Sequence, residues 1–190
     1  MRRFAAMLLF LAAAQARAAE PAAVAGERHE RAPRSYANLR VGASSSSAHP
    51  ELCLEVSPLE LLGLEACGTG SGFLHNDPAP EIAHFRSKWK LTDWHTQIGW
   101  LQPRVGFGFA ELQVGEDGAG FDFAGTGVTG VETAGPELGA SVRALWPVWG
   151  GFELLGELNL SLGYFHHAPR LLLPQNRWQP SASFTLGFGF

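Results

Sequence analysis

Beyond its first 18 residues, the sequence lacks any apolar run that approaches the about 20 consecutive residues of a membrane-spanning helix. Long stretches with helical periodicity are missing as well, whereas glycine is abundant, with 23 residues. If this chain spans a membrane, it must therefore do so with strands, because a closed β-barrel is then the only structure that pairs every backbone polar group.

Cysteine is scarce too, and neither cysteine lies near the N-terminus. Two arginines are followed by an apolar stretch over residues 4–14 and by the small-x-small pattern of residues 16–18. These features predict a secretory signal peptide over residues 1–18, which is too short to cross a bilayer as a helix. Because the first cysteine is Cys53, a lipoprotein anchor at the cleavage site is not expected.

Basic residues are few once the signal peptide is removed. Residues 1–18 hold three of the 14 Lys and Arg residues, so 11 basic residues remain against 18 acidic ones, a net charge of −7. This balance argues against nucleic acid as a partner. It also differs from that of basic proteins that dock on anionic lipid headgroups.

The strongest pattern that is present is strict alternation at the end of the chain. One face of this segment carries Phe184, Leu186, Phe188 and Phe190, and the residues between them are Ser, Thr and Gly. A period of two residues predicts a strand. Transmembrane barrels have an apolar outer face and a small or polar inner face, so this segment resembles a barrel strand.

The same alternation recurs along the chain after a flexible periplasmic segment at 19–34. It predicts eight strands, at 35–43, 51–57, 61–72, 82–92, 98–112, 136–146, 152–165 and 178–190. The predicted fold is all-β: a single eight-stranded antiparallel up-and-down transmembrane β-barrel over residues 35–190. Pro103 predicts a bulge or other irregularity in the fifth strand, because proline disrupts strand interiors.

The connections alternate in length, as they do in outer-membrane barrels. Short turns are expected at 58–60, 93–97 and 147–151, and longer loops at 44–50, 73–81, 113–135 and 166–177. Short periplasmic turns and longer external loops are the usual asymmetry, with both termini in the periplasm. Four tryptophans lie by the short turns, as in an interfacial aromatic belt: Trp94, Trp100, Trp146 and Trp149.

On these patterns the chain resembles the small eight-stranded outer-membrane β-barrel proteins of Gram-negative bacteria. In that family the last strand ends in an aromatic residue, and the barrel-assembly machinery reads this strand during insertion. The resemblance makes Phe184, Leu186, Phe188 and Phe190 the expected insertion signal. It implies outer-membrane location, with outer-membrane lipid and the assembly machinery as partners, and the chain is expected to be a monomer without a cofactor.

Cys53 and Cys67 both fall on inward positions of adjacent predicted strands. A register in which paired residue numbers sum to 120 would bring them together, and a disulfide would suit the oxidising periplasm. Closing this loop would contribute roughly 3 kcal/mol. The alternative is a pair of small buried thiols, and the sequence leaves both open.

Many inward positions carry charge, although eight strands leave an interior only wide enough for side chains. Such charges should pair with one another, because an unpaired buried charge is very costly. The sequence therefore predicts a polar plug and a closed lumen. The residues concerned are Arg40, Glu55, Glu65, Arg86, Lys88, Lys90, Arg104, Glu137, Arg143, Glu153 and Glu157.

Alternative functions rest on weaker signals. His166 and His167 near Ser161 suggest a lipid-modifying enzyme, but no third orienting acid is evident and Ser161 is expected to face inward. The acidic loop 113–135 does not have the spacing of a calcium loop. No catalytic, cofactor or metal residue is assigned on these grounds.

Two further functions are conceivable. The first is transport of small hydrophobic molecules, which would leave through the barrel wall near Pro103. The second is a soluble periplasmic barrel, but it would need a polar outer face, which the leucine rows contradict. Residues 171–173 are three leucines that could cover the barrel mouth, touch lipid or meet a partner. The favoured function is a structural or surface-recognition role through the external loops, above all 113–135 and 166–177.

Overall fold

The computed structural model describes residues 35–190 except 72–73, 76–78 and 116–129. These residues belong to one compact unit, Ala32–Phe190. The expected signal peptide and the segment 19–34 lie outside the described residues. Within the described part of the chain, no helix is long and apolar enough to cross a membrane.

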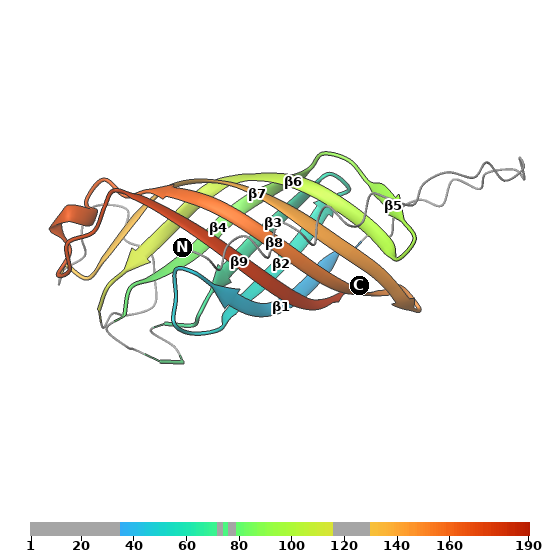
Figure 1. Cartoon of the computed structure of the whole chain (residues 1–190), viewed down its shortest axis with the longest axis horizontal. Coiled ribbons are helices and arrows are strands. Elements are labelled where there is room, and N and C mark those ends of the chain that lie inside the picture. The colour runs from blue at the N-terminus through green and yellow to red at the C-terminus, as the bar shows by residue number, and fades with distance from the viewer. Residues whose placement is uncertain (1–34, 72–73, 76–78, 116–129) are drawn as a thin grey trace, which may run out of the picture. The chain divides into compact units, whose positions relative to one another are not determined.

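The described chain forms nine antiparallel strands and one 3₁₀ turn (Figure 1). The strands are β1 (Ala37–Ser44), β2 (Glu51–Leu59), β3 (Leu62–Gly68), β4 (Glu81–Lys90), β5 (Trp94–Thr96), β6 (Gly99–Gln113), β7 (Glu132–Trp149), β8 (Phe152–Tyr164) and β9 (Trp178–Gly189), and the 3₁₀ turn is η2 (Ala168–Arg170).

Eight of these strands close a barrel. Neighbouring strands pair in the order β4, β3, β2, β1, β9, β8, β7, β6, and β6 pairs with β4 to close the circle. The short strand β5 pairs with the first residues of β6 and lengthens that hairpin. The predicted all-β, eight-stranded antiparallel barrel is confirmed.

Two expected turns are partly strand. The turn predicted at 93–97 contains β5, and β7 continues to Trp149, into the turn predicted at 147–151. β7 also begins earlier than expected, because residues 132–135 pair with β6 in an unbroken register. Tertiary pairing here extends strands that local composition, rich in glycine and acid, marks as loop.

The irregularity expected at Pro103 is wrong. β6 keeps one register with β7 from Trp100 to Gln113. The Pro103 carbonyl accepts a hydrogen bond from the Leu91 amide at 3.0 Å, so the nitrogen of Pro103 faces the same side. Because β4 has already ended there, at Lys90, the missing N–H removes no bond within the named strands.

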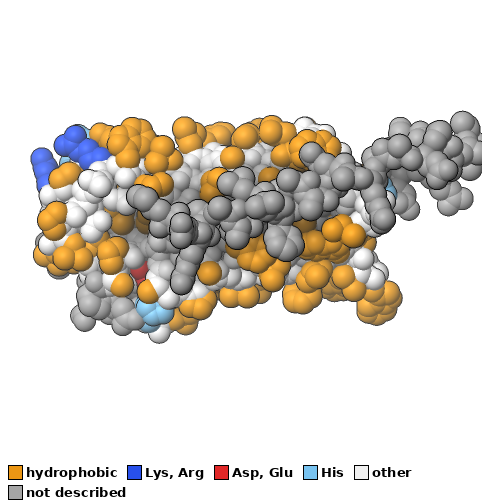
Figure 2. Space-filling view, viewed as in Figure 1, with side chains coloured by type: hydrophobic (Ala, Val, Ile, Leu, Met, Phe, Trp, Pro, Cys, Tyr) orange, Lys and Arg blue, Asp and Glu red, His pale blue; other side chains and the backbone are white. Residues whose placement is uncertain are grey.

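The barrel is apolar outside and polar inside. Leu39 is 53% exposed on the outer face, whereas its neighbour Arg40 points inward and is only 2% exposed. The same alternation runs along every long strand, and Figure 2 shows many hydrophobic side chains along the visible wall. A protein folded in water shows the opposite preference, since charged side chains are rarely buried and large apolar ones usually are.

The two ends of the barrel differ. We call the end with residues 60–61, 91–98 and 150–151 the turn end, and the end with residues 45–50, 69–71, 74–75, 79–80, 114–115, 130–131 and 165–177 the loop end. Trp94 and Trp149 are exposed at the turn end. At the loop end the rings of Tyr164 and Trp178 contact each other, with centroids 4.7 Å apart.

The first and last strands approach each other very closely where they close the barrel. Seven residue pairs join β1 to β9. A Cβ atom added to Gly187 would lie 1.9 Å from the Leu39 carbonyl oxygen, and one added to Gly42 would lie 1.9 Å from the Phe184 carbonyl oxygen. Closure therefore depends on glycine in both strands.

We expect Gly187→Ala to destabilise the folded barrel by about 1–3 kcal/mol, because the added methyl group forces the two strands apart. Urea unfolding of the refolded protein, followed by tryptophan fluorescence, measures this loss. Gly68→Ala is the matched control, since its new Cβ would meet nothing closer than the Ala83 Cβ at 3.5 Å. Equal stability of the two variants would contradict this account of closure.

Candidate functional site

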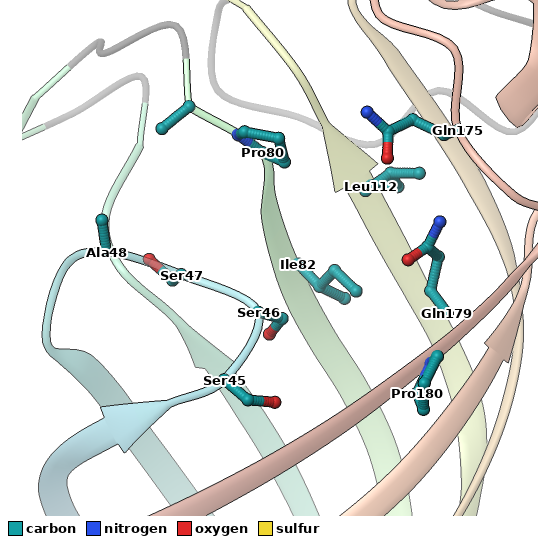
Figure 3. Close-up of a pocket in the computed structure, with 11 residues that line it drawn as sticks. Ser45, Ser46, Ser47, Ala48, Pro80, Ile82, Leu112, Gln175, Gln179 and Pro180 are labelled. Atoms are coloured by element: carbon teal, nitrogen blue, oxygen red, sulfur yellow. The ribbon is translucent and has the colours of Figure 1, made fainter. Parts of the chain in front are cut away.

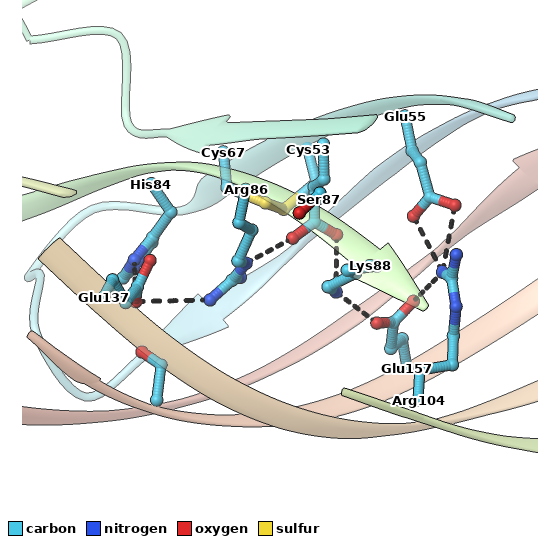
Figure 4. A network of polar contacts seen from close by, with 12 residues as sticks. Cys53, Glu55, Cys67, His84, Arg86, Ser87, Lys88, Arg104, Glu137 and Glu157 are labelled. Carbon is cyan, nitrogen blue, oxygen red and sulfur yellow. Dashed lines mark hydrogen bonds and ion pairs between the residues drawn. A yellow bond between two sulfur atoms is a disulfide. The ribbon is translucent and has the colours of Figure 1, made fainter. Parts of the chain in front are cut away.

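The barrel interior holds a continuous network of ion pairs (Figure 4). Its members project inward from β1, β2, β3, β4, β6, β7 and β8, because each occupies an inward position of the period-two pattern. Four carboxylates meet five cations: Glu55, Glu65, Glu137 and Glu157 with Arg40, Arg86, Lys88, Arg104 and Arg143.

Glu157 on β8 is the most connected carboxylate. Its Oε2 atom lies 2.6 Å from Arg40 Nη1 and 2.6 Å from Arg143 Nη2. Its Oε1 atom accepts a hydrogen bond from Lys88 Nζ. One buried side chain thereby links β1, β4 and β7.

Glu55 and Glu65 extend the network to the opposite wall. Arg104 Nη1 lies 2.9 Å from Glu55 Oε1, and Arg143 Nη1 donates to the same oxygen at 3.0 Å. Glu65 accepts hydrogen bonds from Arg86 Nε at 2.6 Å and from Lys88 Nζ at 2.7 Å. Arg40 contacts both carboxylates.

Glu137 carries the network toward the loop end. It lies 2.6 Å from His84 Nδ1 and 3.3 Å from Arg86 Nη1. The other ring nitrogen of His84, Nε2, lies 3.7 Å from Glu51 Oε1. Sequence reasoning did not include His84 and Glu51 among the site residues, although both follow the inward parity of their strands.

The structure brings together nine of the eleven lumen residues predicted from the sequence. The other two lie toward the turn end. Lys90 Nζ pairs with Asp93 at 2.6 Å and lies 3.7 Å from Glu60. Glu153 is buried, and no ion pair between it and the nine residues is found in the described part of the chain.

A disulfide joins Cys53 and Cys67 on the inner wall. β2 and β3 pair with residue numbers that sum to 120, so the two cysteines lie directly opposite each other, with Cα atoms 4.1 Å apart. Figure 4 shows the bridge beside the charge network.

The residues expected to signal insertion lie on β9 and at its end. Phe184, Leu186 and Phe188 are exposed on the outer face. Phe190 is held by β1, because its amide donates to the Ala37 carbonyl at 3.0 Å and its carbonyl accepts from the Tyr36 amide at 2.6 Å.

Ser161 and the His166–His167 pair are not brought together as a catalytic pair. The Ser161 hydroxyl faces inward and lies 2.7 Å from the Ser181 hydroxyl. The rings of His166 and His167 contact each other edge to face, with centroids 4.8 Å apart. In the described residues, no hydrogen bond links either histidine to Ser161.

An apolar layer covers the charge network at the loop end. Phe165 and Ala168 are fully buried, and Leu171 is nearly so, whereas Leu172 and Leu173 are exposed. Together with residues of β4 and β6 they form one cluster: Ile82, Ala110, Leu112, Val114, Phe165, Ala168 and Leu171. The segment around η2 thus packs against the ends of β4 and β6 at the loop end.

A cavity of about 460 Å³ lies beside this layer (Figure 3). It is lined by the serines of residues 45–47, by Pro80 and Ile82, and on the far side by Gln175 and Gln179. Most of the loop 113–135 lies outside the described residues, including Glu116, Asp117 and Asp122. Its fourth acidic residue, Glu132, is the first residue of β7.

No protein-family model, curated protein or solved structure matches the chain.

We expect Glu157→Gln to lower the free energy of unfolding by about 3–5 kcal/mol, because it removes one buried counter-charge of each of Arg40, Lys88 and Arg143. Urea unfolding in detergent micelles measures the change. Glu60→Gln is the control, since the Glu60 side chain is 71% exposed, and an exposed ion pair contributes at most about 1 kcal/mol. A loss of under 1 kcal/mol for Glu157→Gln would contradict the role of the network.

Proposed function

We propose that this protein is an integral outer-membrane β-barrel of a Gram-negative bacterium, with a closed lumen and with its functional surface at the loop end. In this proposal residues 1–18 direct export and are cleaved, and Phe184, Leu186, Phe188 and Phe190 engage the barrel-assembly machinery. The role is structural or one of surface recognition.

The observation that carries the proposal is the inverted distribution of side chains. Leucine, valine and phenylalanine cover the outer wall, and the inner wall carries ion pairs. In water such an exterior would aggregate, because soluble monomers rarely expose large apolar patches. In a bilayer it is the favourable arrangement, since lipid tails then replace water around the apolar wall.

Aromatic residues at both ends of the barrel also support its placement in a membrane. Exposed Trp94 and Trp149 at the turn end, and the Tyr164–Trp178 pair at the loop end, would lie at the two interfaces of a lipid bilayer. Strands of 7 to 18 residues bracket the about 9–11 residues that a tilted strand needs to cross it.

The network and the apolar cluster at the loop end support the proposal of a closed lumen. The side chains of Arg40, Glu55, Glu65 and Glu157 are at most 1% exposed, which indicates that they fill the middle of the barrel. Above them the apolar cluster around Phe165 and Leu171 lies across the mouth. Ions would have to break several charge-assisted hydrogen bonds to pass, and those bonds are among the strong ones.

The competing functions have less support. Ser161 is engaged with Ser181 inside the barrel, which does not favour a lipid-modifying enzyme. β6 runs past Pro103 in register with β7, which does not favour a transport path through the wall there. What remains accessible to a partner is the loop end, with its cavity and the exposed Leu172 and Leu173.

Substitution of a single leucine on the outer wall tests whether the barrel is embedded in a membrane. We expect Leu158→Arg, halfway along β8, to destabilise the protein by about 2–4 kcal/mol in phosphocholine bilayers, the cost of a cation at the bilayer midplane. In water the same change at a side chain this exposed is nearly neutral. Urea unfolding in large unilamellar vesicles measures the cost.

Leu172→Arg is the matched control, because Leu172 is exposed on the loop that follows η2 and not on the wall. It should leave stability in vesicles nearly unchanged. Heat-modifiable migration on a denaturing gel shows that each variant has folded. If Leu158→Arg were as neutral as the control, the wall would not be in contact with lipid.

Planar-bilayer recording tests the closed lumen. The reconstituted protein should show no steady conductance above the leak of the bare bilayer, with a water-filled porin as the positive control for the assay. A stable ohmic step of constant size for each inserted protein would mean that ions cross the network.

A further inference from the structure

Three residues from distant parts of the sequence converge at the loop end. His49 lies in the β1–β2 connection, His75 in the β3–β4 connection, and Glu81 is the first residue of β4. Their ligand atoms all lie within 4.8 Å of one another. His49 Nδ1 is 3.0 Å from Glu81 Oε1, and His75 Nε2 is 3.8 Å from the same oxygen.

We propose that His49, His75 and Glu81 bind a divalent transition-metal ion, with Zn²⁺ as the best match. Two imidazole nitrogens and one carboxylate oxygen form the donor set of many zinc sites that keep a position open. Bonds of about 2.0–2.1 Å in tetrahedral directions put neighbouring ligand atoms roughly 3.4 Å apart. The distances from Glu81 Oε1 to His49 Nδ1 and to His75 Nε2, 3.0 and 3.8 Å, lie on either side of that value.

The two ring nitrogens of His75 give the strongest argument for a metal ion at this site. Both of its ring nitrogens are buried, and neither has a hydrogen-bond partner among the described residues. Buried polar atoms without a partner are uncommon, and an ion is one of the usual reasons for them. A metal bound to Nε2 would supply the missing interaction.

The carboxylate is buried and already oriented. The side chain of Glu81 is only 4% exposed, whereas those of His49 and His75 are 31% and 18% exposed. Thr69 donates its hydroxyl hydrogen to Glu81 Oε2, which leaves Oε1 turned toward the two histidines. Such an outer partner typically fixes a ligating carboxylate in place.

The two imidazoles stack on each other beside this carboxylate, so one ring has to turn out of the stack for both nitrogens to bind the same ion, because each lone pair lies in its ring plane. Their rings stack with centroids 3.9 Å apart and an angle of 25° between the planes. Nitrogen donors favour zinc, copper or nickel over magnesium and calcium, which prefer all-oxygen sites.

The site borders the cavity at the barrel mouth. Ala48 and Pro80, which line that cavity in Figure 3, directly precede His49 and Glu81 in the sequence. Three protein ligands leave at least one coordination position for water or for a small anionic or neutral ligand held in the cavity. The inference concerns the loop end alone and does not depend on the barrel's being in a membrane.

The test uses the full-length refolded protein in detergent, stripped with a chelator and then titrated with Zn²⁺ by calorimetry. We expect one ion per chain. His49→Ala, His75→Ala and Glu81→Gln should each weaken binding on the order of 100-fold or more, and Thr69→Val about 10–100-fold, as for partners outside the ligand set. Cobalt(II) gives a second readout, since its visible absorption strengthens on leaving six-coordinate water.

The double variant His166→Ala/His167→Ala is the control, because it removes one exposed and one half-buried histidine elsewhere at the loop end. It should bind Zn²⁺ as the unaltered protein does. Heat-modifiable migration checks that every variant is folded, and the near-isosteric Glu81→Gln keeps the test valid if a histidine variant does not fold. Absence of binding, or binding that only the control variant loses, would overturn the proposal.

Discussion

The pairing of buried carboxylates with buried cations is the constraint on which this barrel depends. Glu157 contacts Arg40, Lys88 and Arg143, which come from three different strands. A slip of one residue in any of these strands would turn its charge to the outer face and leave partners unpaired inside. Because an unpaired buried charge costs several kcal/mol, the network selects one set of registers around the whole barrel.

The barrel interior has a charged middle and an apolar end. Charges occupy the middle, where side chains from opposite walls can reach each other, and the apolar cluster with Phe165 and Leu171 lies toward the loop end. The segment around η2 can fold inward only because the side chains it covers, such as Ile82 and Leu112, are themselves apolar. A polar residue there would lose its water without gaining a partner.

The sequence predicts the direction of each side chain far better than its partners. Period-two alternation is local, so it assigns Arg40 and Glu157 to the inner face correctly. Their contact spans 117 positions, and it depends on the register of every strand between them and on closure between β1 and β9. The convergence of His49, His75 and Glu81 escapes sequence reasoning for the same reason, because three separate segments must first be placed.

The Cys53–Cys67 disulfide links two strands that the backbone already pairs, so it clamps a single hairpin and ties no distant parts of the chain together. Barrel closure rests on other contacts, made by residues that oxidation does not change. Material accumulated with reduced thiols, as in cytoplasmic inclusion bodies, therefore keeps every group needed to close the wall, and oxidation can follow refolding.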